Sequence, residues 1–258
     1  MGVISFGDLA KANADYCIVI PSHGRAGHIQ AVQQVFPNAV MYIHRDELPE
    51  YSATCHLPII LHDKTDGYGS VLNSIFDRCV DAGIRYCAVF DDDVERFSTH
   101  VGNRDRFFNA EQTEQAILNG CQVLEDLDAG IYLFCTCGSI IRYNQAEPFK
   151  VGFSLPQGAA IFRCAMMGRF VEKMHHYEDF DFCMEYLLKH RYMVIDNRLQ
   201  ANADALYNEG GCNSFRSGEN EKKCREYILK KWKSHVKFVI SPTSGVMRPT
   251  CTAVRKQK

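Results

Sequence analysis

The stretch YCAVFDDD, residues 86–93, places three consecutive carboxylates directly after five apolar residues. A short apolar run with a polar boundary predicts a buried β-strand. Carboxylates at the end of such a strand are costly to desolvate unless a cation faces them. Helical periodicity precedes the strand, from Ser70 to a stop at Gly83, and follows it over residues 110–127. The stretch therefore predicts an acidic group at the end of a strand that lies between two helices.

The rest of the chain continues this alternation of strands and helices. Further strands are expected at residues 16–20, 39–43, 57–61, 131–136, 192–195 and 236–240, and further helices from Glu178 and over residues 222–232. This order predicts an α/β fold with a Rossmann-type, mostly parallel sheet and helices on both faces. We expect residues 1–245 to form a single domain, followed by a basic C-terminal tail over residues 246–258.

Composition limits the class of protein. Of the 258 residues, 46% are apolar and 23% are charged, which is typical of a folded chain with a substantial core. The net charge of −2 means that any site for a polyanion must be a local basic patch. No apolar stretch approaches the roughly 20 residues of a membrane span, and residues 1–14 do not resemble a secretory signal. A cytoplasmic protein is therefore expected, without a membrane partner.

The chain contains twelve cysteines. In a reducing compartment, they are expected to pack as small hydrophobic side chains. Several lie inside apolar runs, which fits this interpretation: Cys17, Cys79, Cys87, Cys121 and Cys183. The C-x2-C spacing of zinc sites is absent, so the sequence does not favour structural zinc.

The three aspartates are the first candidate site. Ligands of parallel α/β sheets bind beyond the carboxyl ends of the strands, so residues 21–25 and 91–93 should converge. Hard oxygen ligands suit Mg²⁺ or Mn²⁺, and Asp91 and Asp93 could hold such an ion against a diphosphate. A solvated turn or a helix cap is the structural alternative.

The second candidate is the acidic start of the helix at Glu178. Asp179 could act as a general base toward an acceptor hydroxyl, with Glu178 beside it. Carboxylates in a first helical turn, including Asp181, are also favoured by the helix dipole alone. The residues themselves leave both interpretations open.

Together these motifs resemble those of GT-A glycosyltransferases. The resemblance rests on IVIPS at residues 18–22, DDD at residues 91–93 and ED at residues 178–179, in that order. It implies a metal-dependent transferase with a UDP-sugar donor, held by Pro21, Ser22 and the aspartates. It also implies that Asp91 and Asp93 bind the metal, that Asp92 contributes to the donor site, and that Asp179 or Glu178 serves the acceptor.

A narrower resemblance is to the TET-associated glycosyltransferases of bacteriophages and the related base J glucosyltransferases. PSHGRA at residues 21–26, FDDDV at 90–94 and EDFDF at 178–182 are similar to segments of those enzymes. The resemblance implies a 5-hydroxymethylpyrimidine acceptor in DNA, with 5-hydroxymethylcytosine favoured over 5-hydroxymethyluracil and UDP-glucose as the favoured donor. It further implies a C-terminal metal-binding histidine, for which His235 and, as an alternative, His190 are available. Each could instead be an ordinary histidine.

Three further segments could serve such a reaction. Arg25 could meet the donor phosphates, and the Asp66-Gly67 loop could approach the donor closely, or it could simply lead into a helix. One segment mixes arginines with an aromatic residue: Arg96, Arg104, Arg106 and Phe107. The arginines could contact a phosphate backbone and the ring could stack on an unpaired base; a surface loop is the alternative. The loop over residues 208–216 could close over the donor.

The sequence therefore predicts a metal-dependent, inverting transfer of sugar to DNA, acting in the cytoplasm of an infected bacterium if phage-encoded. A flipped-out target base would reach the site. The alternatives are a GT-A enzyme acting on a glycan, lipid or protein, a sugar nucleotidyltransferase, and a non-catalytic nucleotide-sugar or DNA-binding module.

Overall fold

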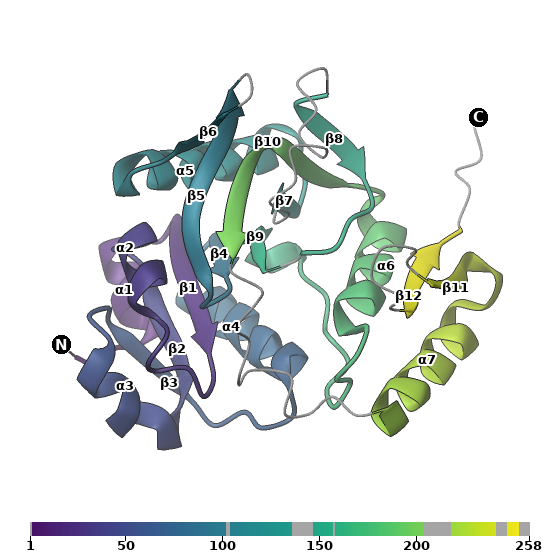
Figure 1. Cartoon of the computed structure of the whole chain (residues 1–258), viewed down its shortest axis with the longest axis horizontal. Helices are drawn as coiled ribbons and strands as arrows, with labels where there is room; N and C mark the ends of the chain where they lie inside the picture. The colour runs from purple at the N-terminus through teal and green to yellow at the C-terminus, as the bar shows by residue number, and fades with distance from the viewer. Residues whose placement is uncertain are drawn as a thin grey trace.

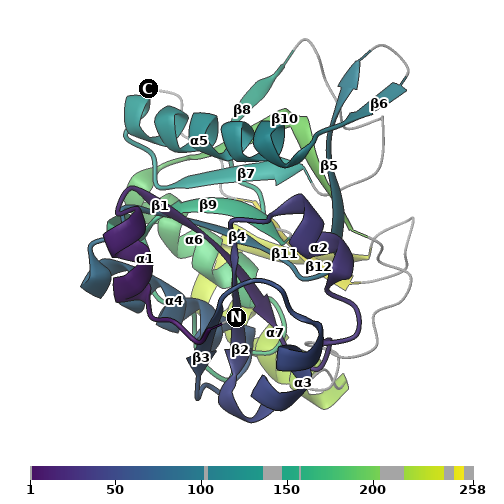
Figure 2. The same ribbon diagram turned by 90° about the vertical axis from the view of Figure 1, so that its left-hand side faces the viewer.

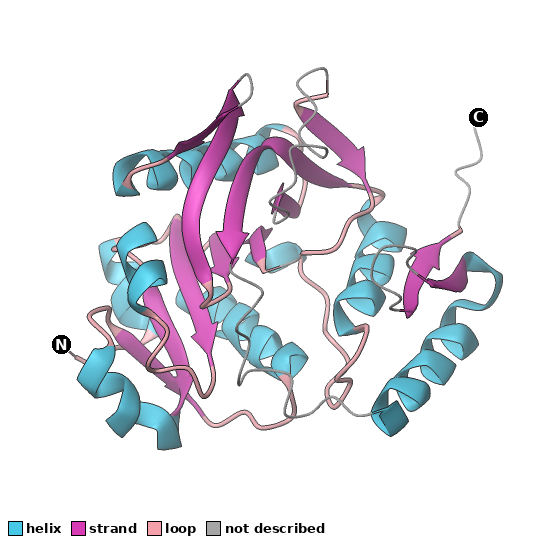
Figure 3. Cartoon of the chain, viewed as in Figure 1, coloured by secondary structure: helices cyan, strands magenta, loops and turns pink. Residues whose placement is uncertain are grey.

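The computed structural model describes residues 2–101, 104–135, 147–156, 158–203, 218–240 and 247–252. The helices of this part are α1 (Phe6–Ala12), α2 (Gln30–Val35), α3 (Leu48–Thr54), α4 (Tyr68–Ala82), α5 (Ala110–Asp126), α6 (Glu178–His190) and α7 (Gly218–Trp232), with 3-10 turns η1 (Arg45–Glu47), η3 (Cys164–Met166) and η6 (Lys233–His235). Figure 3 distinguishes these helices from the strands.

The strands form one large sheet and one small hairpin (Figure 1). They are β1 (Tyr16–Ser22), β2 (Val40–His44), β3 (Ile59–His62), β4 (Tyr86–Phe90), β5 (Val94–Val101), β6 (Arg104–Phe107), β7 (Ile131–Cys135), β8 (Phe149–Gly152), β9 (Ala159–Arg163), β10 (Met193–Ala203), β11 (Val236–Ile240) and β12 (Met247–Cys251). The large sheet has the order β3-β2-β1-β4-β9-β7-β10-β5-β6, and β8 pairs with β10. Strands β11 and β12 form the hairpin.

Most strands of the large sheet point the same way. The pairs β1–β2, β2–β3, β1–β4 and β7–β10 are parallel. Strand β9 runs antiparallel to both β4 and β7, and β5 and β8 run antiparallel to β10. The predicted α/β fold with a mostly parallel sheet is confirmed, and the antiparallel strands are an addition that the sequence pattern did not indicate.

Helices cover both faces of the sheet, as predicted (Figure 2). Because alternate residues of a strand point to opposite faces, β1 directs Ile18 and Ile20 toward α2, α3 and α5, and Cys17 and Val19 toward α1, α4 and α6. A third, smaller core joins the outer side of α6 to α7 and β11 through Phe180, Ile228 and Trp232, among others.

The local sequence of α4 is sufficient to explain why this segment is a helix and where the helix ends. Its apolar stripe buries Leu72, Ile75 and Phe76 against the sheet. The helix ends at Gly83, whose φ of 78° is left-handed and whose backbone N–H is bonded to the carbonyls of Cys79 and Val80. Glycine adopts this conformation without the steric cost of a Cβ.

The structure differs in three segments from the organisation expected from the sequence. The Arg–Phe segment after the aspartates, for which the sequence assigned no strand, is a β-hairpin, β5–β6. The strand expected at residues 192–195 extends to Ala203 as β10. Within the expected C-terminal tail, Met247–Cys251 pairs with β11 as strand β12. The loop at 208–216 and residues 253–258 lie outside the described residues, and the division at residue 245 stays a prediction.

Candidate functional site

The carboxyl ends of β1 and β4 lie side by side, because the two strands are parallel neighbours with Val19 paired to Val89. The chain leaves β4 into Asp91 and leaves β1 into His23. The predicted convergence of residues 21–25 with the three aspartates is therefore confirmed by the sheet and by the side-chain contacts between the two segments.

Asp92 is held by residues of the β1 segment. Its side chain is buried and accepts hydrogen bonds from the Ser22 hydroxyl and, at 2.6 Å, from Arg25 Nη1. The Ser22 hydroxyl also lies 2.6 Å from the hydroxyl of the fully buried Tyr51, which accepts a bond from the Arg25 backbone N–H. Ser22 and Tyr51 therefore orient the pair formed by Arg25 and Asp92.

Arg25 is the cation that faces the acidic group. Besides Asp92, its Nη1 lies 3.5 Å from Asp93 Oδ2, and its side chain is only 13% exposed. One guanidinium thus faces three carboxylates, so a single positive charge does not balance the group. In this structure Arg25 contacts the aspartates, whereas the sequence suggested donor phosphates as its partner.

The pKa of Asp91 is strongly perturbed by its surroundings. Burial, followed by the negative charges of Asp93 and Asp92, raises the pKa of Asp91 to about 7. Tyr68 opposes this shift, since its hydroxyl donates a hydrogen bond to Asp91 Oδ1 at 3.2 Å. Burial and the charge of Asp92 also raise the pKa of Asp93. A divalent cation would relieve both carboxylates, which is the electrostatic property expected of a metal site.

Gly158 closes one side of Asp91. Its carbonyl accepts a 2.8 Å hydrogen bond from the Asp91 N–H, and its φ is 74°. A Cβ at this position would lie 2.0 Å from Asp91 Oδ2, far inside van der Waals contact. The chain therefore needs glycine here both for its backbone conformation and for the space that Asp91 occupies.

The raised pKa of Asp91 predicts a pH-dependent stability of the metal-free protein. A carboxyl with a folded pKa near 7 and an unfolded pKa near 3.8 favours folding while it is protonated. That stability is fully present below about pH 4 and is lost as the pH rises through 7. In EDTA, we expect Asp91→Asn to have a Tm about 4 °C or more above that of the parent at pH 8, and a smaller difference at pH 5.

Calorimetry or intrinsic fluorescence at the two pH values measures this difference. Asp77→Asn, an exposed carboxylate on α4 paired with Arg169, is the matched control and should keep the pH dependence of the parent. Equal slopes of Tm against pH in parent and Asp91→Asn would contradict a perturbed Asp91.

The Asp66-Gly67 loop leads into α4 and positions Tyr68. Gly67 precedes the helix with a φ of 93°, and a Cβ there would lie 2.7 Å from His175 Nδ1. The Asp66 carbonyl accepts a bond from the Lys173 N–H at 3.0 Å. The close approach that glycine permits is thus to the segment that precedes α6, and the loop has the geometry of a helix entry.

Among the carboxylates at the start of α6, Asp181 makes structural contacts to α7. Asp181 is 1% exposed and accepts bonds from Lys231 at 2.6 Å and from the Trp232 indole at 2.7 Å, so it ties α6 to α7. Asp179 is half-buried, and Glu178 is buried. Since Lys173 and His175 pack on residues 66–67, the start of α6 lies beside the loop that carries Tyr68 to Asp91.

The two histidine candidates lie apart from the aspartates. His235 is exposed in η6, and its carbonyl accepts a bond from the Thr252 N–H. His190 ends α6 and stacks on Tyr186. Within the described ranges, one group of three possible metal ligands has its ligand atoms within 4.8 Å of one another. It consists of Cys17, Cys79 and Cys87. The structure thus does not bring His235 together with Asp91 and Asp93 in such a group.

The arginine and aromatic candidates lie on the β5–β6 hairpin, which follows the aspartates directly at Val94. Arg96, Arg104, Arg106 and Phe107 are all exposed, and the Arg96 guanidinium lies 5.2 Å from the centre of the Phe107 ring. By contrast, Phe97 is buried in the core. The hairpin therefore presents three cations and one aromatic ring at the sheet edge.

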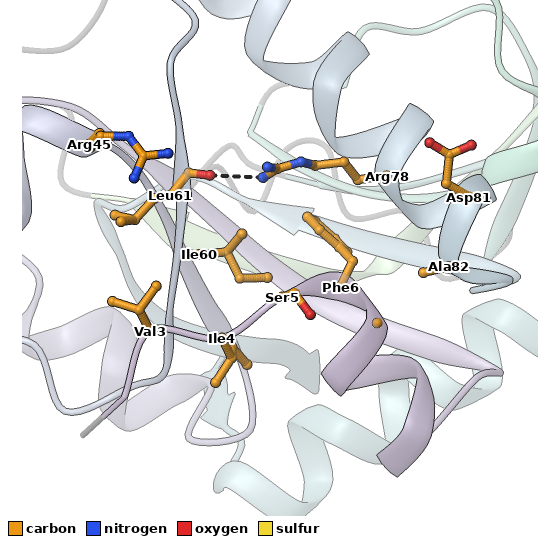
Figure 4. A pocket seen from close by; sticks show the side chains of 11 residues that line it. Val3, Ile4, Ser5, Phe6, Arg45, Ile60, Leu61, Arg78, Asp81 and Ala82 are labelled. Atoms are coloured by element: carbon orange, nitrogen blue, oxygen red, sulfur yellow. Dashed lines mark hydrogen bonds between the residues drawn. The ribbon is translucent and has the colours of Figure 1, made fainter.

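A separate cavity of about 450 Å³ lies near the N-terminus (Figure 4). Its walls combine apolar side chains with Arg45 and Arg78 from η1 and α4, and it includes none of the predicted site residues. Arg78 Nη1 donates to the Leu61 carbonyl at 2.8 Å, and Arg45 pairs with Asp63. Both arginines thus have partners within the protein.

The sequence did not reveal three contributors to the site. Tyr68 of α4 and Gly158 before β9 contact Asp91, and Tyr51 of α3 contacts Ser22 and Arg25, which hold Asp92. Tyr68 directly follows the Asp66-Gly67 loop, so its position next to a candidate segment was the sequence feature that could have indicated its role. Tyr51 and Gly158 carried no local signal, because their role depends on contacts between distant segments.

No protein-family model and no curated protein sequence matches the chain. Several solved structures are similar to it, and three of them are described here. A structure described as a mycobacterial protein has a TM-score of 0.51 at 10% identity, covering 95% of this chain and 86% of that chain. Glucosyl-3-phosphoglycerate synthase from Mycobacterium tuberculosis, in complex with Mg²⁺ and uridine diphosphate, has a TM-score of 0.50 at 11% identity, covering 96% and 92%. GalNAc-T7 with UDP, GalNAc and Mn²⁺ has a TM-score of 0.51 at 8% identity, covering 86% and 49%.

These similarities establish the fold, which is that of GT-A glycosyltransferases. Among the described residues, no helix has the length and apolar character needed to cross a membrane.

Proposed function

We propose that this chain is a metal-dependent glycosyltransferase that moves a sugar from a UDP-sugar to the hydroxymethyl group of a 5-hydroxymethylpyrimidine in DNA. The observation that carries the proposal is the acidic group of Asp91, Asp92 and Asp93 at the carboxyl end of β4 in a GT-A fold. Open α/β sheets bind their ligands at this edge. UDP-glucose is the favoured donor, and 5-hydroxymethylcytosine is favoured over 5-hydroxymethyluracil.

Asp91 and Asp93 fit a divalent cation. Their oxygens are the ligand type that Mn²⁺ and Mg²⁺ prefer. Both have raised pKa values beside a single guanidinium, so they lack sufficient positive charge. A bound cation would supply Lewis acidity toward the diphosphate. Arg25, bonded to Asp92 and through its backbone N–H to Tyr51, would maintain the positions of the carboxylates around that ion.

Asp179 is the proposed general base. In the proposed reaction the acceptor oxygen forms a bond to the anomeric carbon, while the bond from that carbon to the diphosphate oxygen breaks and UDP leaves. The acceptor proton passes to Asp179, and attack opposite the leaving group inverts the anomeric centre. Glu178 would contact the acceptor. His235 stays only a sequence-based candidate for the metal.

The β5–β6 hairpin supports a nucleic-acid acceptor. It extends directly from Asp93 and carries Arg96, Arg104 and Arg106 in exposed positions. Phe107 is 55% exposed, which leaves its ring accessible to a base. Cations that contact phosphates and a ring that stacks on an unpaired base are the combination used by proteins that bind single strands or flipped bases.

The proposal is tested with one duplex synthesised with cytosine, 5-hydroxymethylcytosine or 5-hydroxymethyluracil at the same position. The protein, Mn²⁺ and a panel of UDP-sugars are added, and nucleoside masses are measured after digestion. We expect a hexose mass increase on a hydroxymethylated duplex and none on cytosine. The opposite result is sugar transfer to a glycan, lipid or protein acceptor but to neither modified duplex. That result would contradict the DNA acceptor and leave the proposal of glycosyl transfer intact. Donor binding without transfer or hydrolysis would favour a non-catalytic module.

Removing two hairpin cations should weaken DNA binding selectively. We expect Arg104→Ala/Arg106→Ala to lower affinity for DNA and to reduce the slope of log affinity against log salt by about two, because each phosphate contact releases counterions. Fluorescence anisotropy over a salt series measures both quantities. UDP affinity should be unchanged. Arg45→Ala, an exposed arginine outside the hairpin, is the control. An unchanged salt slope in the double variant would contradict a role for the hairpin.

A further inference from the structure

Four buried cysteines from separate elements lie near the amino ends of β1 and β4. Cys17 of β1 and Cys87 of β4 are register partners in adjacent strands. Cys79 reaches them from α4, and Cys164 begins η3 after β9. All four belong to the core on the side of the sheet that α4 and α6 cover. The fold thus collects thiols from positions that no short sequence motif connects.

The sulfur positions suit a tetrahedral ion. The Sγ atoms of Cys17 and Cys79 are 3.8 Å apart, and those of Cys17, Cys79 and Cys87 all lie within 4.8 Å of one another. Cys164 belongs to the same core, and its Sγ lies 3.9 Å from the Phe162 carbonyl oxygen. Thiolates bound at about 2.3 Å to a tetrahedral zinc are about 3.8 Å apart. The spacing of Cys17, Cys79 and Cys87 is therefore close to that of zinc ligands, whereas the Cys164 side chain would have to move closer to serve as the fourth.

The buried surroundings of these cysteines explain why thiolates would need a cation here. Cys79 and Cys87 are fully buried, and Cys17 and Cys164 are almost so. An unpaired thiolate is costly to bury, so thiolates form here only if a positive charge is buried with them. A soft, thiophilic cation supplies that charge and binds sulfur strongly.

We propose that Cys17, Cys79, Cys87 and Cys164 form a structural zinc site. Zinc bound there would link β1, β4, α4 and η3 near the amino ends of β1 and β4, opposite the strand ends that precede His23 and Asp91. Binding releases the thiol protons and contributes to folding. Since the ligands are buried, the ion is acquired as the chain folds and exchanges slowly afterwards. This proposal is independent of the acceptor and of the metal at Asp91 and Asp93.

The first test uses the full chain produced with zinc in the medium and dialysed against EDTA. We expect about one zinc per chain by mass spectrometry, released to a colorimetric zinc indicator only on unfolding. Refolding with Co²⁺ should give thiolate-to-cobalt charge-transfer absorption. Asp93→Asn should keep the zinc, which separates this site from the aspartates. Zinc-free protein after folding with zinc present, or iron with inorganic sulfide in its place, would overturn the proposal.

The second test changes the ligands. The double variant Cys17→Ser/Cys79→Ser should lose the EDTA-resistant zinc and have a lower Tm. Cys183→Ser is the matched control, because Cys183 is a fully buried thiol of the same core outside the group of three. Full zinc content in the double variant would overturn the assignment. If the double variant does not fold, the cobalt spectrum of the parent decides, since a spectrum without thiolate bands excludes sulfur ligands.

Discussion

Replacing Asp93 with asparagine is expected to lower sugar transfer by about three orders of magnitude while the fold is retained. The amide keeps the shape of the side chain but removes the charge that would hold the metal. Arg25 keeps its closer partner, Asp92, at 2.6 Å against 3.5 Å for Asp93, so the β1–β4 connection survives. Initial rates with UDP-glucose, and circular dichroism for the fold, measure the two parts of this prediction.

Chelation supplies the complementary measurement. EDTA should inactivate the parent to a similar extent, and added Mn²⁺ should restore the parent but not Asp93→Asn. Asp77→Asn, which removes an exposed charge on α4, should behave as the parent does. Full activity of the parent in EDTA would rule out a catalytic metal at these aspartates, although it would leave the GT-A fold unaffected.

The second large effect is expected at Asp179. Asp179→Asn should lower kcat by about 10²- to 10⁴-fold, because a general base acts in the transition state. The affinity for UDP-glucose, measured by calorimetry, should change little, since a base contributes little to binding of the donor. A loss of donor affinity as large as the loss of kcat would instead place Asp179 in the donor site.

Asp181 provides the control for this experiment from the same helical turn. Asp181→Asn leaves Lys231 without one of its two carboxylate partners and weakens the bond from Trp232, so the variant should have a lower Tm. Asp179→Asn should keep a Tm close to that of the parent. Two neighbouring carboxylates are thus distinguished, one by a catalytic readout and the other by thermal stability.

The N-terminal part of the fold could be predicted from sequence because its elements are set by local patterns. Local sequence patterns are sufficient to predict strands β1, β2 and β4, which are short apolar runs, and helix α4, which has an apolar stripe. The hairpin β5–β6 and strand β9 could not be assigned in the same way. Strand β5 mixes buried Phe97 and Ser98 with exposed Arg96, so its pattern is not strictly alternating. Its pairing with β10 joins residues far apart in the chain.

The location of the candidate site could be predicted, but the division of roles among its aspartates could not. Parallel neighbouring strands bring their carboxyl ends together, and this rule placed Ser22 and Arg25 beside the acidic group. Which carboxylate meets Arg25 depends on the local backbone, and the structure assigns that contact chiefly to Asp92. Similarly, the search for C-x2-C spacing could not reveal cysteines that approach one another only through the pairing of β1 with β4.

Gly158 has a consequence for variation among related chains. It contributes no functional group, yet any larger residue would place its Cβ 2.0 Å from the carboxylate of Asp91. Exhaustive substitution should therefore show position 158 to be as intolerant as the aspartates, although it lies more than sixty residues further along the chain. In an alignment of homologues, such a position would be an invariant glycine that reflects the space reserved for a neighbouring side chain.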